Sequence, residues 1–491
     1  MGDETLVVHG GEILTASGAL ERADVVIANG RIERVGAGEV PSGCAVLDAG
    51  GTIVVPGLIN AHYHSNENFN PGRYENLPLD LWFVHSHQVT RLAPMSPEAI
   101  YARTLLGAVQ MLQSGTTAVV DFLFEAPEVS MDTLEPVVRA YRDVGLRATI
   151  LLGVADKPFA ASLPLSERDR AVAAREAAPP DVDRVMDLAR AAVDRFHEPG
   201  GLIGIGLGPS APQRCTEALL DGTAAFTRDH GLVWQTHVQE TRTQAVTARE
   251  WHDGGTFVDF LAGRDLLGPH ATLVHTVWLT GGDVRRMAET GTAAVHCPYS
   301  NLRLGDGVAD LPALRRAGVR VALGTDGRGC DETLDALELT RLAALLPKAR
   351  GLHFEQWPTA RDAFAMATRD ASPCAGHGER LGRIEPGASA DLVLLRRDTV
   401  TFTPLHDPVR QLVFGATARD VRTVVVDGRV VVDHGEVLGI DLPGLLRDAS
   451  RFAAEELELA GGADGSDAVE AVVRAAYERA EQAPLDVHSY I

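Results

Sequence analysis

The chain has 491 residues, and 45% of them are hydrophobic, so it can bury one large core with a smaller domain beside it. Its formal net charge of −22, with Lys and Arg not clustered, argues against nucleic acid or an anionic membrane as a partner. Five scattered cysteines do not form a disulfide framework, the acidic start lacks the order of a signal peptide, and no apolar run could cross a membrane. We therefore expect a cytoplasmic protein that acts on a small-molecule substrate.

Both ends of the chain predict short β-strands joined by tight turns, with Asn29-Gly30 and Asp427-Gly428 typical of hairpins. The predicted strands cover residues 5–15, 24–28, 31–35, 390–396, 421–426 and 429–433. We expect one small β-sandwich built from residues 1–57 and 388–440. Residues 441–491 are helical and charged, and we expect them to form a C-terminal appendage that packs on the protein or forms a dimer contact, without chemistry of its own.

The long middle of the chain alternates between apolar strands and helical patterns. The predicted strands end near His62, Asp121, Val154, Leu207, His237, His275, His296 and Asp326. The predicted helices include residues 97–114, 181–195, 216–230 and 310–317. Eight strand–helix units predict an α/β fold, a (β/α)₈ TIM-type barrel over residues 58–387. An open doubly wound sheet is the alternative, but no glycine-rich dinucleotide fingerprint follows an early strand.

Histidines and aspartates gather at the predicted strand ends, which in a barrel face the active site. His62 and His64 are two residues apart at the first end, so both imidazoles can point to one face. With His237 at the fifth end and Asp326 at the eighth, they predict a site for one divalent metal with an open position for water. Zinc is the first expectation, and iron, cobalt and manganese are alternatives. Such a metal makes hydroxide available near neutral pH, and Asp326 can both bind it and accept the proton of the water.

Two further side chains at these strand ends suggest catalytic roles. Glu240 stands three residues beyond His237, where it can lie beside the metal and transfer a proton to a leaving group or ring nitrogen. The alternative is that Glu240 begins the next helix, where acids are favoured by the helix dipole. His275 is either a fifth ligand or a group that orients the hydroxide and stabilises developing charge, and we favour the second role.

Polar and aromatic side chains near these positions suggest a substrate pocket. After the seventh strand, we expect His296, Ser300 and Asn301 to shape the pocket, with Asn301 bonding a substrate heteroatom. Trp82, in the long loop after the first strand, either lines the pocket or packs the loop as a lid. A nucleophilic Cys297 is the poorer interpretation, because the sequence pairs it with no suitable base.

Several segments carry a family resemblance when they are taken together. They are residues 56–64, 237–240, 275–279, 296–304, 324–326 and 382–393. In their order and spacing they resemble the amidohydrolase superfamily, and most of all the group of S-adenosylhomocysteine and methylthioadenosine deaminases and s-triazine chlorohydrolases. The resemblance implies a barrel with a β-sandwich and one zinc or iron, and homodimers are common in this group. It also implies site roles that match the assignments above: ligands His62, His64, His237 and Asp326, proton shuttle Glu240, and His275 beside the attacking water.

The resemblance implies a metal-dependent hydrolase in which metal-bound hydroxide attacks an sp² carbon. A deaminase of an amino-substituted heterocycle is the first expectation. Hydrolysis of an amide, urea, (thio)carbamate or aryl-halide bond by the same residues is the alternative, and a non-catalytic scaffold is a third. Nucleoside-type members carry an acidic residue that reads ribose hydroxyls after a segment like Leu77 to Trp82, but residues 83–92 contain none. This departure argues against an adenosine-type substrate.

Overall fold

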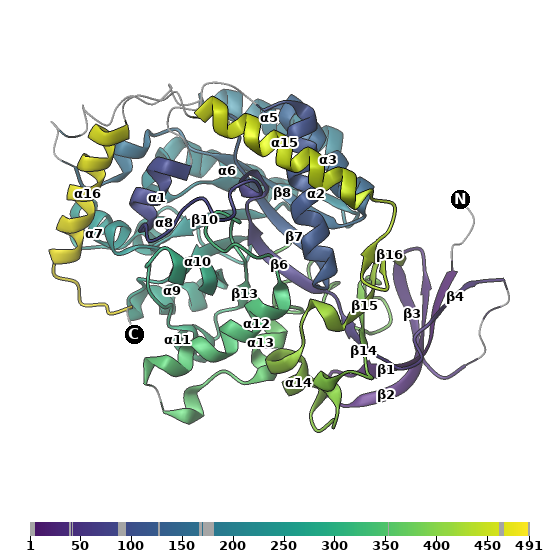
Figure 1. Ribbon diagram of the computed structural model, residues 1–491. Coiled ribbons are helices and arrows are strands. Elements are labelled where there is room, and N and C mark those ends of the chain that lie inside the picture. The colour runs from purple at the N-terminus through teal and green to yellow at the C-terminus, as the bar shows by residue number, and fades with distance from the viewer. Residues whose placement is uncertain are drawn as a thin grey trace.

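The structure is a computed structural model that describes residues 5–38, 41, 43–86, 95–125, 128–165, 169, 181–351, 353–460 and 466–489. Its centre is a barrel of eight parallel strands that pair in chain order (Figure 1). The strands are β6 (Leu58–Tyr63), β7 (Thr116–Leu123), β8 (Arg147–Val154), β9 (Ile203–Pro209), β10 (Trp234–Val238), β11 (Ala271–His275), β12 (Ala293–His296) and β13 (Val321–Leu323). The predicted barrel is confirmed, and the predicted strand ends lie at or close to the observed ones.

Side chains close the barrel where β13 meets β6. The Asn60 carboxamide donates to the Thr325 hydroxyl (2.7 Å) and accepts from the Thr325 backbone N–H (3.1 Å). The backbone N–H of Asp326 donates to the carbonyl of His62 (3.0 Å). A Cβ at Gly324 would lie 2.7 Å from His62 Cβ, so this close approach requires glycine. Closure of the barrel therefore brings Asp326 beside the histidines of the first strand.

Helices surround the barrel, and polar side chains define where they begin. Ser96, Thr216 and Asp310 each accept a hydrogen bond from a backbone N–H in the first turn of the helix that follows. The four predicted helices match α2, α5, α6 and α11 within one residue at either end. The helices up to the second β-region are α1 (Leu79–Ser86), α2 (Pro97–Gln113), α3 (Met131–Val144), α5 (Val182–Phe196), α6 (Glu217–His230), α7 (Arg242–Trp251), α8 (Phe257–Gly263), α9 (Gly281–Thr290), α10 (Pro298–Arg303), α11 (Leu311–Arg316), α12 (Ala336–Leu345) and α13 (Ala360–Met366).

A second, mixed sheet lies beside the barrel and combines strands from both ends of the chain (Figure 1). Its members are β1 (Thr5–Leu14), β2 (Leu20–Ala28), β3 (Arg31–Gly36), β4 (Ala45–Asp48), β5 (Thr52–Pro56), β14 (Leu392–Arg396), β15 (Val421–Val426), β16 (Arg429–Asp433) and β17 (Glu436–Val437). β5 and β14 pair antiparallel and join the two halves. Buried Arg147, at the start of β8, bonds Asp391 (2.9 Å) and Asp427 (2.6 Å) of this region, so an ion-pair network fixes the sheet to the barrel.

α14 (Pro408–Gly415) lies between β14 and β15, and the C-terminal part after β17 contains α15 (Leu442–Ala460) and α16 (Ser466–Gln482). α15 packs on α2, whereas α16 packs on α1 and α7 (Figure 1). Residues 461–465, 490 and 491 of the expected appendage lie outside the described residues. Within the described ranges, every helix is too short or too polar to span a bilayer.

Candidate active site

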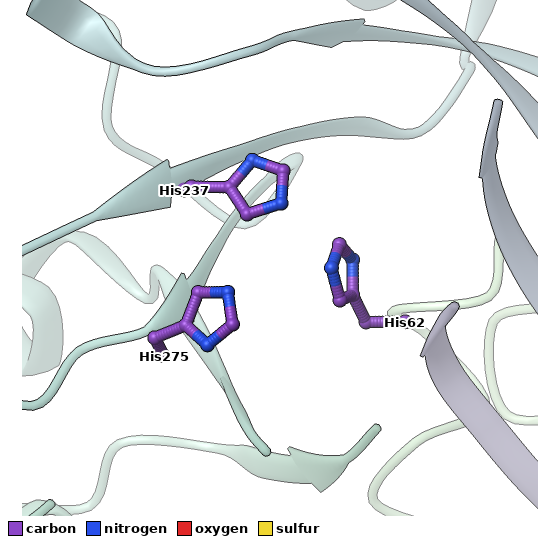
Figure 2. A group of neighbouring side chains, drawn as sticks. All are labelled: His62, His237 and His275. Atoms are coloured by element: carbon purple, nitrogen blue, oxygen red, sulfur yellow. The ribbon is translucent and has the colours of Figure 1, made fainter. Parts of the chain in front are cut away.

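The strand ends bring the predicted metal ligands to one point. His62 lies in β6 and His237 in β10, while His64 and Asp326 lie just beyond β6 and β13. His64 Nε2 is 3.2 Å from Asp326 Oδ1, and His62 Nε2 is 3.7 Å from the same oxygen. Figure 2 shows the rings of His62, His237 and His275 facing a common space, and one nitrogen of each lies within 4.8 Å of the others. The four predicted ligands and His275 therefore converge.

The other ring nitrogens of these histidines are held by oxygen atoms. His62 Nδ1 bonds Gln235 Oε1 (2.7 Å), His64 Nδ1 bonds the Phe122 carbonyl (2.6 Å) and His237 Nδ1 bonds the Ser210 carbonyl (2.6 Å). Carbonyl oxygens only accept, so each Nδ1 carries a hydrogen and each Nε2 is the nitrogen left to bind a cation. Among the described residues, His62 Nε2 has no hydrogen-bond partner although it is buried. This donor set fits a divalent cation with nitrogen and oxygen ligands.

The electrostatics of the ligands suit the same role. Burial lowers the pKa of His62 and of His237 well below the usual histidine value, so both stay neutral and able to bind metal. Burial also acts to lower the pKa of His64, but its hydrogen bond to Asp326 and the carboxylate charge raise it to about 9. Burial alone would raise the pKa of Asp326, yet the surrounding histidines hold it well below its usual range. A cation that binds here displaces the His64 proton, so its affinity falls as pH falls.

The backbone at these strand ends adopts unusual conformations. The φ angles of Gln239, His275 and Asp326 are 48°, 68° and 68°, in the left-handed region that non-glycine residues rarely occupy. Each of these residues ends a barrel strand or closely follows one. The side chain that points towards the site is its own or that of the next residue. Such strained residues persist where the surrounding structure fixes them, and they concentrate at functional sites.

Glu240 and His275 form the second part of the site. His275 Nε2 is 3.4 Å from Glu240 Oε1 and 3.9 Å from Asp326 Oδ2. Asn301 Oδ1 accepts from His275 Nδ1 (3.0 Å), which fixes the tautomer of His275. Gln244 bonds Glu240 twice, through the Glu240 backbone N–H (3.0 Å) and the carboxylate (3.3 Å). Burial raises the pKa of Glu240 well above its usual value, and the Asp326 charge raises it further, so Glu240 can hold a proton.

A pocket opens over this constellation. It is lined by His64, His237, Glu240, His275 and Asp326 from the site, by the rings of Trp82, Phe83, Phe124 and Phe159, and by Asp80, Gln213 and Arg214. Trp82, expected in a loop after the first strand, lines this pocket from α1, and its binding of substrate stays a prediction. His296, Ser300 and Asn301 are buried at the end of β12 but do not line this pocket, and their binding of substrate stays a prediction. Residues 87–92, which were expected to continue the loop after Trp82, lie outside the described residues.

Several residues of the site were not foreseen from the sequence. Gln235 had a usable signal, because it stands two residues before His237 on the same strand and so points to the same interior. Gln244 stands four residues after Glu240, one helical turn on, which is a weaker signal. Asp80 and Gln213 had no signal in the sequence, because their position in the pocket depends on how α1 and the loop after β9 cross the mouth of the barrel.

Fold and site together define a metal-dependent hydrolase built on a (β/α)₈ barrel. Residues 53–431 match the model of the Amidohydrolase family. The chain belongs to this family, and the predicted class, an amidohydrolase acting on C–N bonds other than peptide bonds, is confirmed with it.

Curated relatives and solved structures agree with this assignment. The chain is 34% identical to the 5-methylthioadenosine/S-adenosylhomocysteine deaminase of Halobacterium salinarum, over 93% of this chain and 99% of the relative. It is 32% identical, with the same coverage, to the 5'-deoxyadenosine deaminase of Methanothermobacter thermautotrophicus. The atrazine chlorohydrolase of Arthrobacter aurescens complexed with zinc matches with a TM-score of 0.82 at 25% identity, over 91% of this chain and 100% of that one. An adenosine deaminase of Xanthomonas campestris with bound zinc matches with a TM-score of 0.79 at 25% identity, over 92% and 98%.

Proposed function

We propose that the protein is a zinc-dependent deaminase of adenosine-like compounds, which replaces the amino group of the adenine ring by oxygen and releases ammonia. The observation that carries the proposal is the placement of Glu240, a buried carboxyl with a raised pKa, 3.4 Å from His275 and beside the four ligands. The curated relatives are named as deaminases of adenosine derivatives, and this supports the substrate class. It outweighs the argument against an adenosine-type substrate that came from the absence of an acid in residues 83–92. Zinc in two structural neighbours supports the choice of metal.

The residues of the chain suggest how the reaction proceeds. A divalent cation held by His62, His64, His237 and Asp326 would lower the pKa of water and so supply the nucleophile near neutral pH. Asp326, ionised because the histidines lower its pKa, can accept the proton of that water. His275, with Nδ1 tied to Asn301, directs Nε2 into the same space and can orient the nucleophile and stabilise developing charge.

Glu240 completes the proton transfers. Burial raises the pKa of Glu240 and so favours its protonated form, and the bonds from Gln244 hold the carboxyl in one orientation. From there it can give its proton to a ring nitrogen. The departing amino group then takes the proton that Asp326 accepted from water and leaves as ammonia, and the proton of the newly added hydroxyl returns to Glu240. The aromatic side chains of Trp82, Phe83 and Phe124 give the pocket flat apolar walls that suit a heterocycle.

The test is ammonia release from a panel of adenine nucleosides by the zinc-loaded protein. Wild type should release ammonia, and Glu240→Gln should lose at least about 100-fold in kcat, because a general acid–base group contributes that much. Zinc content should stay at the wild-type level, since Glu240 is not a ligand. Full turnover in Glu240→Gln would remove its proposed role.

A second candidate is hydrolysis of a different leaving group by the same residues. The TM-score of 0.82 to an atrazine chlorohydrolase favours it as the alternative. Incubation with chlorinated s-triazines, followed by measurement of chloride, separates the two functions. Chloride without ammonia would replace deamination as the conclusion.

A further inference from the structure

The segment that follows α16 contacts the loop just beyond His275. This segment, residues 483–489, runs from α16 across the face of the barrel where the strands end (Figure 1). Ser489 is 2% exposed, and its hydroxyl donates a hydrogen bond to the carbonyl of Val277 (2.7 Å). Val277 stands only two residues after His275. Ser489 is therefore bonded to the stretch of backbone that carries one of the reacting groups.

The backbone at this point adopts a strained conformation. The φ angles of His275 and Thr276 are 68° and 48°, so two successive non-glycine residues lie in the left-handed region. Such conformations persist only where the surrounding structure fixes them. On the barrel side, the N–H of Val277 donates to the carbonyl of Gln239 (3.1 Å). Ser489 fixes the same peptide segment through the carbonyl of Val277, so both sides of the strained turn are bonded.

The same serine also contacts the loop beyond Asn301, the residue that fixes the tautomer of His275. The backbone N–H of Val308 donates to the carbonyl of Ser489 (2.5 Å). A Cβ at Gly307 would lie 2.6 Å from that carbonyl oxygen, so this close approach requires glycine. Ser489 thus connects two loops, one that follows His275 and one that follows Asn301.

Other contacts fix the segment before it reaches these loops. The guanidinium of Arg242 donates to the carbonyl of Ala483 (2.6 Å), where the segment leaves α16. Leu485 and Val487 pack in an apolar cluster with Trp278. The segment is therefore anchored along its length, and Ser489 can act as a fixed support for the two loops.

We propose that Ser489 is a positioning residue, which connects the loops of His275 and Asn301 and so keeps His275 Nε2 directed at the reacting groups. The described residues that line the substrate pocket do not include Ser489, so it acts through His275 and not on the substrate. Displacement of a catalytic group by about 1 Å can cost about 100-fold in rate, so a distant support of this kind affects turnover. The inference rests on the proposed deaminase function and adds a residue to its machinery.

The first test compares Ser489→Ala with a matched serine variant. Ser489→Ala should lower kcat for an adenine nucleoside roughly tenfold, with KM and zinc content near wild type, because the pocket wall and the ligands are unchanged. Ser114→Ala is the control. Ser114 is also 2% exposed and donates to a backbone carbonyl, that of Met111 (2.9 Å), but it precedes β7 at the opposite end of the barrel. It should lose similar stability and keep wild-type kcat.

A double variant tests whether Ser489 acts through His275. Asn301→Leu changes the same imidazole, so the two changes should not combine independently. The double variant Ser489→Ala with Asn301→Leu should lose less kcat than the product of the two single losses, because residues of one network are coupled. The same combination with Ser114→Ala should give the simple product.

Hydrogen exchange measured by mass spectrometry follows the loop without turnover. The backbone amides of residues 276–278 should exchange at least about fivefold faster in Ser489→Ala than in wild type, because the strained turn loses one of its fixed bonds. Ser114→Ala should leave exchange in these residues unchanged.

Several results would overturn the proposal. They are a wild-type kcat in Ser489→Ala, equal losses of kcat in the two serine variants, or a rise in KM with unchanged kcat. Independent losses in the double variant would also contradict it. If wild type deaminated no adenine nucleoside, the proposed function would fall, and hydrogen exchange would still decide this inference. Unchanged exchange of residues 276–278 in Ser489→Ala would then show that Ser489 does not support the loop of His275.

Discussion

Replacement of Gln235 by leucine tests the metal centre through a residue that does not touch the metal. Gln235 is fully buried, its Oε1 accepts from His62 Nδ1 (2.7 Å), and its Nε2 donates to the carbonyl of Ala61 (3.1 Å). Leucine has a similar volume but can make neither bond. His62 could then place its hydrogen on Nε2, the nitrogen that must bind the cation.

The size of the effect follows from these two bonds. Metal binding would force the hydrogen of His62 onto Nδ1, where the leucine side chain leaves it buried without an acceptor, at a cost of about 1–3 kcal/mol. At about 1.4 kcal/mol for each factor of ten, this corresponds to roughly 5- to 150-fold weaker binding. Loss of a partner that orients a metal-bound histidine generally costs about 10–100-fold, which agrees. We expect Gln235→Leu to bind zinc about 10- to 100-fold more weakly.

The assay is competition for zinc against a chromophoric chelator of known affinity at pH 7.5. Gln244→Leu is the matched control, because Gln244 is also a buried glutamine but bonds Glu240 and no ligand. The control should keep wild-type zinc affinity and lose turnover. Unchanged zinc affinity in Gln235→Leu, with a normal melting temperature, would refute the assignment of His62 Nε2 as the donor atom.

Three further predictions concern other parts of the molecule. Asn301→Leu should lower kcat at least about tenfold with little change in KM or zinc affinity, because His275 can change tautomer without the Asn301 acceptor while no contact to substrate is lost. Steady-state kinetics measure this effect. Val473→Asp places a charge in the apolar cluster where α16 packs against α1, so it should raise KM and speed proteolysis at the C-terminus. Burial raises the pKa of the Asp80 carboxyl from its ordinary 3.8 to about 6, so the folded protein binds the proton more tightly and we expect its stability to fall as pH rises from about 4 to about 6. Asp80→Asn should remove this dependence and stabilise the protein by about 1–3 kcal/mol at pH 7, as measured by urea unfolding.

Each of these predictions has an outcome that would contradict it. A rise in KM with unchanged kcat in Asn301→Leu would instead support the direct contact between Asn301 and substrate that the sequence predicted. Unchanged KM and proteolysis in Val473→Asp would show that α16 does not support the pocket wall. Equal slopes of stability against pH in wild type and Asp80→Asn would mean that the carboxyl is better solvated than its burial implies.

Local sequence determined the elements and most of the metal site. The spacing of His62 and His64 places two imidazoles on one face of a strand, because successive side chains in a strand alternate. Capping residues such as Thr216 and Asp310 fix where helices begin, through bonds that span only three residues. The alternation of strands and helices predicts a barrel, and a barrel brings the residues at the carboxyl ends of its strands together at one face. Asp326 and His237 could therefore be assigned without coordinates.

Tertiary structure alone decided what surrounds the metal site. Asn301 accepts a hydrogen bond from His275, a contact that its sequence position did not predict. Asp80 and Gln213 enter the pocket from α1 and from the loop after β9. α16, expected only to pack on the protein or form a dimer contact, packs against α1. These contacts join residues that are far apart in the chain, and they depend on the crossing of whole elements. Periodicity and capping act over a few residues, so they carry no information about such contacts, which only the packed fold creates.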